Sequence, residues 1–535
     1  MAMEDDTQRL ATFGYGVQED LPASVFGNKA ANLARMAALG IPVPPGFSLN
    51  VSICEDYFRN GETFPSDIPR ILDEGVAFLE RATGQSLGSL RRPLLVSVRS
   101  GAPVSMPGMM ETLLNVGLSR RTIRGLILQT GNPRFAWDSY RRLLENFGTV
   151  ACGQDPAPYR SLLADTLAEE GVPDEAELDA ASLRNLCGEY ERHYLESTGG
   201  AAFPVDVRAQ ILMAVAAVIR SWMSPRAEAF RRLHPMGDLR GTAVVVQAMV
   251  FGNMGADSGA GVAFTRNPWS GENEFLLDFK FGAQGEDVVS GEQAAVSCRE
   301  FSGRMPAVYE NLSRIGRTLE MHFGDMQDIE FTVQKGVLYI LQSRAGKRTP
   351  LAALRIAVEA CNEGLLSRDQ ALALLEGLDL DAITLQKVVA DEPSLGAGTS
   401  ASTGVATGSI VFSSDRAQQA SAGGPVILVR ETASTDDLRG ISASDGILVA
   451  RGARTSHAAV VARQMGKICI VNCTGLAIDE RRRRCTLGGH ELREGDVITL
   501  DGDTGLIYRG RAGILHERPE SLLAAVRAWT DSRRG

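Results

Sequence analysis

The sequence is poor in residues on which several classes of protein depend. Its 535 residues include eight cysteines, which form no dense framework, and Cys469 and Cys473 have no second pair or nearby histidine to complete a zinc site. Lysine and arginine number 55 against 65 aspartates and glutamates, a net charge of −10. This deficit argues against a general nucleic-acid-binding protein. The sparse cysteines favour reduced, mostly buried thiols in a cytoplasmic protein.

Long hydrophobic runs are also lacking. The run "LMAVAAVI" ends at Arg220 and is far shorter than the roughly 18 residues that a membrane span needs. The N-terminal stretch "MAMEDDTQRL" is acidic and polar, unlike a signal or transit peptide. We therefore expect no membrane partner. A hydrophobic content of 44% suits a globular chain with a buried core, and the length suits several domains.

Several elements follow from periodicity and turn residues. Helical spacing predicts a helix over residues 30–39 that ends at Gly40, with Lys29 in the loop before it. The stretch "RPLLVSVRSG" is typical of a short apolar strand. Residues from about 122 to 223 have amphipathic helical spacing, whereas residues 241–343 have the pattern of strands.

The second half of the chain changes pattern twice. Helices are predicted over about 349–376, where Ser367 and Gln370 form a capping box. The Gly/Ser-rich stretch "DEPSLGAGTSASTG" is typical of a domain linker. Short strands and helices then alternate over about 405–508, as in a compact α/β domain, and the tail "PESLLAAVRAWTDSRRG" has the spacing of one amphipathic helix.

The stretch "DIEFTVQKGVLYILQSR" predicts a hairpin that turns at Gln334-Lys335-Gly336. A register centred on Gly336 places Asp328 across from Arg344 and Glu330 across from Gln342, since side chains alternate between faces. Ile329, Phe331, Tyr339 and Leu341 fall on the other face. Two carboxylates, an amide and a guanidinium on one face suit a magnesium-polyphosphate. On spacing alone, a solvated sheet face with cross-strand pairs is the alternative.

Two cations precede this region. Lys29 follows "FGN" and Arg99 ends the apolar strand, and each alone is more often a surface charge. Gly101 and Gly108 in the following loop allow a close backbone approach to phosphates. The loop lacks the G-x-x-x-x-G-K-[ST] spacing of a Walker A motif. Its methionines, Met106, Met109 and Met110, are by default core residues.

The stretch "ARGARTSHAAVVARQMGKICIVNC" holds His457, one of six histidines. Thr455 or Ser456 can cap a helix that runs from about His457 to Met465, with Gly466 as its C-cap, before the buried strand "ICIVN". A histidine in a first helical turn lies where free N–H groups favour an anion, so a phosphoryl group on its ring would be stabilised there. A histidine with a purely structural role is the alternative. The small residues around His457 leave room for the ring.

Seven blocks of the sequence, in order, resemble the pyruvate phosphate dikinase family. They are "GNKAANLARMAALGIPVPPGF", "LLVSVRSGAPVSMPGMMETLLNVGL", "NPRFAWDSYRRLLENFG", "VFGNMGADSGAGVAFTRNPWSGE", "AQGEDVVSG", "DMQDIEFTVQKGVLYILQSRAGKRT" and "GILVARGARTSHAAVVARQMGK". The resemblance implies a mixed α/β and α+β multidomain chain. Its expected parts are an ATP-grasp nucleotide-binding region over 1–348 with a helical insertion over about 119–223, a helical linker over 349–395, a swivelling phosphohistidine domain over 396–512, and a C-terminal helix over 513–535.

The resemblance also assigns residues to roles. Phosphate binding falls to Lys29 and Arg99, within a site whose further ATP-binding residues are Gly101, Gly108, Gln247, Met249, Val250, Glu286, Gln342 and Arg344. Asp328 and Glu330 would bind Mg²⁺. The catalytic residues would be Arg99, the phosphoryl carrier His457, and Thr455, which matches a threonine that is phosphorylated for regulation in some members. Relatives usually have Gly-Gly-Met before this threonine, whereas this chain has Gly452-Ala453-Arg454.

The resemblance implies a phosphotransferase that uses ATP and phosphate to phosphorylate its own His457, releasing AMP and pyrophosphate. The chain ends about where the family's pyruvate- and phosphoenolpyruvate-binding barrel would begin, so we expect the acceptor on a separate protein or domain, with pyruvate as one candidate. One alternative is a non-catalytic, nucleotide-binding regulatory relative of a dikinase. Another is a phosphotransferase that acts on a different small molecule.

Overall fold

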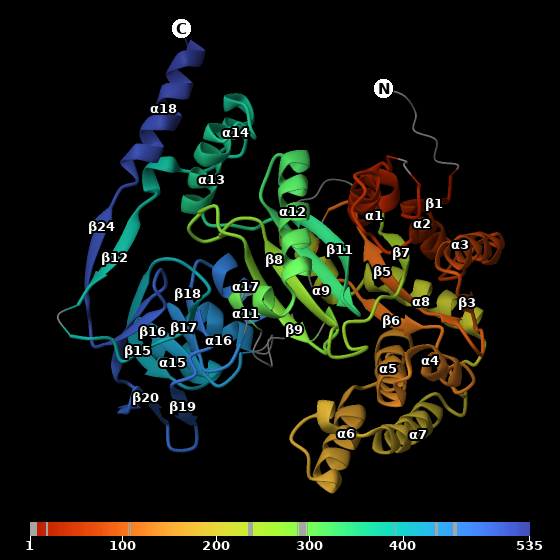
Figure 1. Cartoon of the computed structure of the whole chain (residues 1–535). Helices are drawn as coiled ribbons and strands as arrows, with labels where there is room; N and C mark the ends of the chain where they lie inside the picture. Colours follow the sequence, from red (N-terminus) through yellow and green to blue (C-terminus); the bar gives the residue numbers. More distant parts are fainter. Residues whose placement is uncertain are drawn as a thin grey trace. The chain divides into compact units, whose positions relative to one another are not determined.

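The computed structural model describes residues 8–17, 20–104, 106, 109–233, 239–285, 287, 296, 298–390, 392–433, 437–452 and 457–534. The chain divides into two compact units. The first comprises Met1–Met254 with Tyr339–Gln342, and the second comprises Gly255–Leu338 with Ser343–Gly535. Helices and several separate sheets occur in succession along the chain, which confirms the mixed α/β multidomain class (Figure 1).

The first unit is built on a five-stranded antiparallel sheet with the order β1-β2-β7-β5-β6. Its strands are β1 (Leu10–Phe13), β2 (Gly46–Leu49), β5 (Val96–Gly101), β6 (Thr112–Val116) and β7 (Ala243–Ala248). All residues of β2 and β7 are buried, as expected for central strands covered on both faces. Two short strands that precede β5 in the chain, β3 (Ser86–Leu87) and β4 (Pro93–Leu94), form a separate parallel pair.

Helices cover this sheet and form one large hydrophobic core with it. Those nearest the sheet in the chain are α1 (Ala23–Ala38), α2 (Val51–Arg59), α3 (Ile68–Thr83), α8 (Val207–Ser221) and α9 (Pro225–Leu233). Helix α8 packs on β5 and β6, and the run Ala214–Ile219 within it is almost wholly buried. The apolar run noted in the sequence is therefore a core helix.

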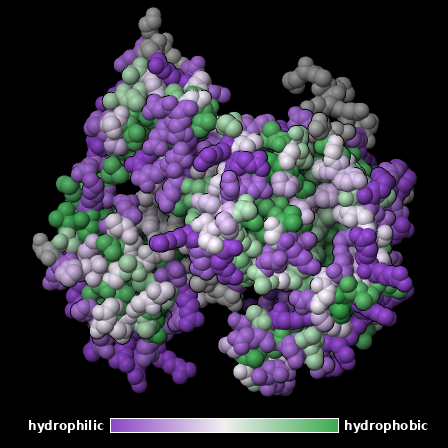
Figure 2. All heavy atoms as spheres, viewed as in Figure 1, coloured by the Kyte–Doolittle hydropathy of each residue, from purple (hydrophilic) through white to green (hydrophobic). Residues whose placement is uncertain are grey.

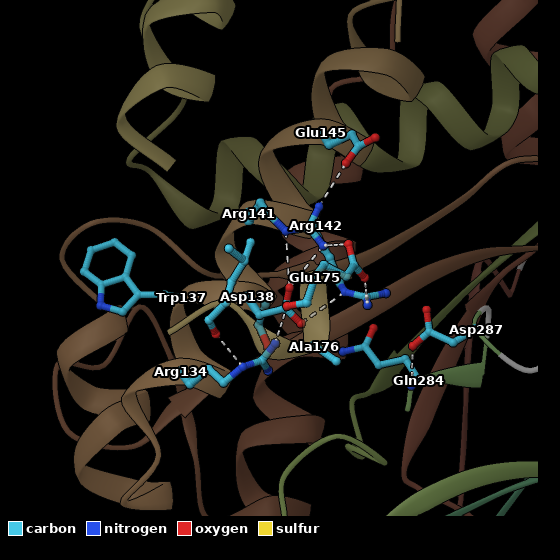
Figure 3. Close-up of polar contacts among 12 residues, drawn as sticks. Arg134, Trp137, Asp138, Arg141, Arg142, Glu145, Glu175, Ala176, Gln284 and Asp287 are labelled. Carbon is cyan, nitrogen blue, oxygen red and sulfur yellow. Dashed lines mark hydrogen bonds and ion pairs between the residues drawn. The ribbon is translucent and has the colours of Figure 1, made fainter. Parts of the chain in front are cut away.

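The helical region predicted over 122–223 is confirmed. Its remaining elements are α4 (Ile123–Thr130), α5 (Pro133–Asn146), the π-helix η1 (Phe147–Ala151), α6 (Ala157–Glu170), the 3-10 turn η2 (Glu175–Glu177) and α7 (Ala180–Ser197). Asn132 caps α5 by accepting a hydrogen bond from the backbone of Phe135. A network of ion pairs ties α5 to η2 through Asp138, Arg141 and Glu175 (Figure 3).

The second unit begins with a four-stranded sheet of the order β11-β10-β8-β9. Its strands are β8 (Gly259–Phe264), β9 (Leu276–Phe281), β10 (Gln327–Gln334) and β11 (Val337–Ala345). The predicted hairpin is present, and its turn is Lys335-Gly336, both with positive φ. The described residues between β9 and β10 include the helices α11 (Cys298–Arg304) and α12 (Pro306–Phe323).

A helical layer and a two-stranded ribbon follow. Helices α13 (Pro350–Asn362), α14 (Arg368–Ala373) and α18 (Glu520–Arg534) share a core that includes Leu523 and Trp529. The capping box of Ser367 and Gln370 is confirmed. The ribbon pairs β12 (Leu385–Val389), which follows the turn η3 (Leu380–Ala382), with β24 (Gly513–Glu517). The C-terminal helix thus begins at Glu520 rather than at residue 513, because residues 513–517 are held as a strand by β12.

An eight-stranded sheet forms the core of the C-terminal α/β region, with the order β13-β23-β22-β15-β16-β17-β18-β14. Four of its strands are parallel: β15 (Val405–Val411), β16 (Val426–Arg430), β17 (Gly446–Val449) and β18 (Ile468–Val471). The crossovers between them are α15 (Ser414–Ser421), α16 (Leu438–Ala443) and α17 (His457–Gln464). Alternate residues of β16 enter two different hydrophobic cores, so both faces of this sheet are buried.

At the edges of this sheet the structure differs from the predicted domain linker. The Gly/Ser-rich stretch expected as a linker contributes two short strands, β13 (Gly396–Ala397) and β14 (Thr399–Ser400), to opposite edges of the sheet. The remaining strands are β22 (Val497–Asp501), β23 (Leu506–Arg509) and a small sheet of β19 (Leu476–Asp479), β20 (Arg484–Leu487) and β21 (His490–Arg493). On the face shown in Figure 2, hydrophobic residues are interspersed with hydrophilic ones.

Candidate functional site

The first group of site residues lies where α1 passes the end of β5, within the first unit. Lys29 is inside α1 rather than in a loop before it, because the helix already begins at Ala23. The helix is interrupted at Gly27, which has φ of 81° and is therefore non-helical. Lys29 follows this interruption by two residues. The sequence shows the glycine, but it does not show that the chain is helical both before and after it.

Gly27 allows α1 and the end of β5 to approach closely. A Cβ atom on Gly27 would lie 1.6 Å from the carbonyl oxygen of Gly101. The backbone N–H of Asn28 donates a hydrogen bond to the carbonyl oxygen of Ala102 over 3.2 Å. The segment that carries Lys29 is thus fixed against the end of the strand that carries Arg99.

Arg99 lies near the end of β5, between β6 and β7, opposite Thr112 and Val245. Arg99 and Lys29 are both half-buried. Met106 is buried, and Met109 and Met110 pack against the core, so the prediction of core methionines is confirmed. Gly108 lies outside the described residues.

Three of the expected ATP-binding residues lie at the end of the central strand β7: Gln247 is within the strand, and Met249 and Val250 follow it. Gln247 is buried, and its side-chain amide donates a hydrogen bond to the carbonyl oxygen of Pro44 over 2.9 Å. The backbone N–H of Met249 donates to Leu95 over 2.9 Å. The side chain of Gln247 is thus already bonded within the protein. The side chains of Met249 and Val250, which are half-buried, are better placed than that of Gln247 to contact a ligand.

Gln342 is also grouped with the first unit. The segment around it is tied to that unit by a hydrogen bond from the backbone N–H of Ile340 to the carbonyl oxygen of Pro42, over 2.8 Å. Gln342 itself is half-buried.

The second group lies on the β10–β11 hairpin of the second unit. Arg344 donates a hydrogen bond from Nε to one carboxylate oxygen of Asp328, Oδ2, over 2.9 Å, and its Nη2 forms an ion pair with the same oxygen, also at 2.9 Å. These two residues therefore lie together, as the hairpin pattern predicts. Within the described part of the chain, the other oxygen of Asp328, Oδ1, is buried and has no hydrogen-bond partner.

Burial dominates the electrostatics of this pair. It raises the pKa of Asp328, an effect that Arg344 opposes and Glu330 reinforces. Burial alone would lower the pKa of Arg344, but the carboxylates of Asp328 and Glu330 raise it above its ordinary value. Glu330 is half-buried two residues along β10, opposite Val262 of β8. Two adjacent acids, one with an unbonded buried oxygen, are a donor set that suits a hard divalent cation.

Glu286, expected to bind ATP, and Thr455, expected to be catalytic, lie outside the described residues. Next to Glu286, the backbone N–H of Gln284 donates to Oδ2 of Asp287 over 2.8 Å, and that of Asp287 donates back to the carbonyl oxygen of Gln284 over 3.1 Å (Figure 3). No group of three or more metal-binding side chains occurs among the residues that the structure describes.

His457 is the first residue of α17, which confirms the predicted helix start; its side chain is not among those described. Helix α17 ends one residue before the prediction, at Gln464, and Gly466 follows with φ of 68°. The next strand, β18, is wholly buried, as predicted. Ala459 and Ala462 attach the helix to the core of the eight-stranded sheet.

Two cations near the hairpin were not singled out by the sequence. Arg463 of α17 has its guanidinium carbon 5.5 Å from the ring centroid of Trp269 and interacts electrostatically with Asp328 and Arg344. Burial lowers the pKa of Lys347, and the nearby charges of Arg344 and Arg463 lower it further. The only sequence signal for Arg463 is its place six residues after His457.

Comparison with known proteins agrees with this architecture. Residues 61–302 and 305–364 match the family described as pyruvate phosphate dikinase, AMP/ATP-binding domain. Residues 423–505, which contain α17, match the PEP-utilising enzyme mobile domain. The chain thus combines a nucleotide-binding domain with a mobile domain. Since the first match covers more than half of it, the chain belongs to the pyruvate phosphate dikinase family.

Individual relatives support the same assignment. The chain is 42% identical to pyruvate, phosphate dikinase of Rhizobium meliloti (strain 1021), over 98% of its own length and 60% of the relative. It is 40% identical to the Clostridium symbiosum protein of that name, over 96% and 59% of the two chains, and 42% identical to the chloroplastic protein 1 of Arabidopsis thaliana, over 98% and 55%. The chain spans about 60% or less of the length of these curated relatives. None of the helices that the structure describes is long and apolar enough to span a membrane.

Proposed function

We propose that the chain is a phosphotransferase that uses ATP and phosphate to phosphorylate its own His457. The observation that carries this proposal is the presence, in one chain, of an AMP/ATP-binding domain and a mobile domain whose helix α17 begins at His457. The reaction balances as ATP, phosphate and histidine giving AMP, pyrophosphate and phosphohistidine. Of the two phosphoryl groups that ATP loses on becoming AMP, one goes to phosphate and forms pyrophosphate. The other goes to the imidazole ring, which releases its proton.

Catalysis would consist mainly of positioning and charge neutralisation, as is general for phosphoryl transfer. Lys29 and Arg99 would hold phosphate groups, and Gly101 and Gly108 would let the backbone approach them. The adenosine would contact Gln247, Met249 and Val250 at the base and Glu286 at the ribose, while Gln342 and Arg344 would contact the polyphosphate. Thr455 would lie beside the phosphorylated ring.

Asp328 and Glu330 would hold Mg²⁺. The unbonded buried oxygen of Asp328 supports this role, since a buried carboxylate oxygen is stabilised by a cation. When bound, the ion would neutralise charge on the phosphate oxygens. Arg344 already holds the other oxygen of Asp328 and so fixes the orientation of the carboxylate.

The finer architecture belongs to the same proposal. We assign an ATP-grasp fold to residues 1–348, a linker to 349–395 and a swivelling phosphohistidine domain to 396–512. The β12–β24 ribbon joins both ends of the swivelling domain to the helical layer and would act as its hinge, because residues 396–400 are strands of the domain's own sheet. The acceptor, with pyruvate as first candidate, would bind to a separate protein or domain, in the cytoplasm.

The test is the intact mass of the protein after incubation with ATP and Mg²⁺, with and without phosphate. The expected result is one acid-labile phosphoryl adduct that requires phosphate and is absent in His457→Ala. His490→Ala is the matched control, because His490 is an exposed histidine of the same region. An adduct that forms without phosphate would favour a different co-substrate. Intact ATP binding without any adduct would overturn the proposal in favour of a regulatory, nucleotide-binding relative.

A further inference from the structure

Arg463 lies near the end of α17, the helix that begins at His457, and its side chain is unusually placed for an arginine. Its Nε and Nη1 atoms are buried, yet within the described residues neither has a hydrogen-bond partner. Leaving a buried donor unbonded costs about 1–3 kcal/mol, and more for a charged group. Such a side chain is stabilised when an acceptor is supplied.

The guanidinium of Arg463 lies over the ring of Trp269. This tryptophan follows β8 and is buried. Its backbone N–H donates to Asn267 Oδ1 over 3.0 Å, and its carbonyl oxygen accepts from Thr349 Oγ1 over 2.7 Å. Its ring lies against Phe264, with centroids 6.3 Å apart. Arg463 thus lies over an aromatic face that is held in place, in an arrangement that attracts a guanidinium without using its N–H groups.

The surroundings of Arg463 also contain an unbonded acceptor. Asp328 and Arg344 both interact electrostatically with Arg463, and Asp328 Oδ1 is buried without a partner among the described residues. Asp328 and Arg463 make no direct ion pair in the described structure, although the charges are opposite. A cation at Asp328 together with an anion at Arg463 would satisfy both groups at once. A metal-bound phosphate is such a pair.

The local charge favours the same ligand. Arg344, Arg463 and Lys347 bring three cationic groups to one place, against the carboxylates of Asp328 and Glu330. Once a divalent ion joins them, the cluster is strongly positive and complementary to a phosphate chain. Lys347 is exposed and adds a third donor group at this place.

We propose that Arg463 is a phosphate-binding residue, supplied by the His457-bearing helix to the Asp328–Arg344 cluster. It would bind a phosphate group of a magnesium-polyphosphate and so couple the docking of α17 to occupation of the site. This inference deepens the proposed function, on which its catalytic meaning rests. Since Arg463 would touch the phosphate chain without accepting the phosphoryl group, its role is to bind and position.

Binding of inorganic pyrophosphate with Mg²⁺ to the full chain, measured by titration calorimetry, tests this proposal without chemistry. Arg463→Gln should weaken binding at least tenfold. Arg463→Lys should weaken it three- to tenfold, because it keeps the charge and loses the planar pair of donors. Arg439→Gln, an exposed arginine on α16 of the same region, should bind like the wild type. Folded Arg463→Gln that binds pyrophosphate within threefold of the wild type overturns the proposal.

Hydrogen exchange separates binding from a merely structural role. In the wild type, Mg²⁺ and pyrophosphate should slow exchange in α17, whereas Arg463→Gln should show wild-type exchange without ligand and no slowing with it. If that variant does not fold, Arg463→Lys decides, and unchanged binding and protection in it overturn the proposal. A wild type that forms no phosphohistidine would refute the proposed function alone, since the pyrophosphate measurements do not depend on phosphoryl transfer.

Discussion

Gly27 of α1 lies directly against Gly101 at the end of β5, so closely that a Cβ on Gly27 would be 1.6 Å from the Gly101 carbonyl oxygen. Real Cβ atoms do not approach a backbone oxygen to this distance, and Gly27 also has φ of 81°. Any side chain at residue 27 would therefore push the helix that carries Lys29 away from the strand that carries Arg99.

Gly27→Ala should for this reason destabilise the first unit and abolish ATP binding. The backbone conformation of Gly27, with φ of 81° and ψ of 153°, alone costs roughly 1–3 kcal/mol for a non-glycine residue, and the backbone clash adds to it. Gly40→Ala is a matched control, because Gly40 at the end of the same helix has φ of 74° but open space around its Cβ position. Calorimetric unfolding and ATP titration should show a modest loss of stability and retained binding for the control. Equal behaviour of the two variants would contradict the prediction.

Asp328→Asn should raise the Mg²⁺ concentration needed for ATP binding at least tenfold. The change removes a buried carboxylate that is suited to the cation and leaves Arg344 without its anionic partner. Glu310→Gln, which removes an exposed carboxylate on α12, should leave the Mg²⁺ dependence unchanged. ATP affinity titrated against Mg²⁺ measures the effect. A parallel loss of affinity at all Mg²⁺ concentrations would indicate that Asp328 serves only to position Arg344.

The β10–β11 hairpin was predicted from the sequence only in part. Period-two alternation and a glycine turn were enough to bring Asp328 and Arg344 together. The sequence also places Tyr339 and Leu341 on the face opposite this pair, but the structure buries their neighbours Leu338 and Ile340. Buried positions in β11 advance by two residues to Ile340 and then by three to Ser343. Such a change of phase within a strand depends on its neighbours, so alternation alone does not reveal it.

Other features depended on contacts between distant segments. The sequence predicts a loop up to Lys29 before the helix, whereas the structure has helix both before and after Gly27. At Gly27 the approach of the Gly101 carbonyl oxygen leaves room only for a hydrogen atom, a contact that the sequence does not reveal. Arg463 has no signal of its own, since a single arginine on an amphipathic helix usually faces water. Its role becomes visible only when folding brings Trp269 and Asp328 beside it. The resemblance identified the family, but not this residue.

Asp138→Asn should destabilise the helical insertion by about 3–5 kcal/mol at neutral pH, because it breaks a buried ion-pair network. Asp138 and Arg141 are almost fully buried and lie 3.1 Å apart, and Arg142 lies 3.2 Å from the other carboxylate oxygen (Figure 3). Burial alone would raise the pKa of Asp138, but the charges of Arg142 and Arg141 lower it below its ordinary value of 3.8.

The lowered pKa sets the sign of the pH dependence. A carboxyl group with a lowered pKa stabilises the folded state above its unfolded-state pKa, and that stability is lost as pH falls through the folded-state value. The difference in the free energy of unfolding between the wild type and Asp138→Asn should thus be constant near neutral pH and should become smaller below pH 3.8. Denaturation followed by hydrogen exchange in α5 measures it. Glu177→Gln, an exposed neighbour in η2, should show no gap, and a gap for Asp138→Asn that widens in acid would refute this account.

Among the described residues of the second unit, Arg266 is the largest fully buried side chain, and it joins the end of β8 to α12 and α13. It donates to Glu320 of α12 from Nε over 2.9 Å and to Glu363, after α13, from Nη1 over 3.2 Å. Thr265 Oγ1 donates to the same Glu320 oxygen over 3.0 Å. Arg266→Met should cost about 3–5 kcal/mol, because it leaves the carboxylate of Glu320 buried and unpaired.

The double variant Arg266→Met/Glu320→Gln should recover part of this loss, since the neutral amide removes the unpaired buried charge. Arg355→Met is the control: Arg355 pairs over 2.9 Å with Glu272, whose side chain is 60% exposed, so its loss should cost at most about 1 kcal/mol. Hydrogen exchange in α12 and α13 under increasing denaturant reports the local stability. If the double variant is no more stable than Arg266→Met, the lost packing of the arginine, rather than the unpaired carboxylate, dominates the cost.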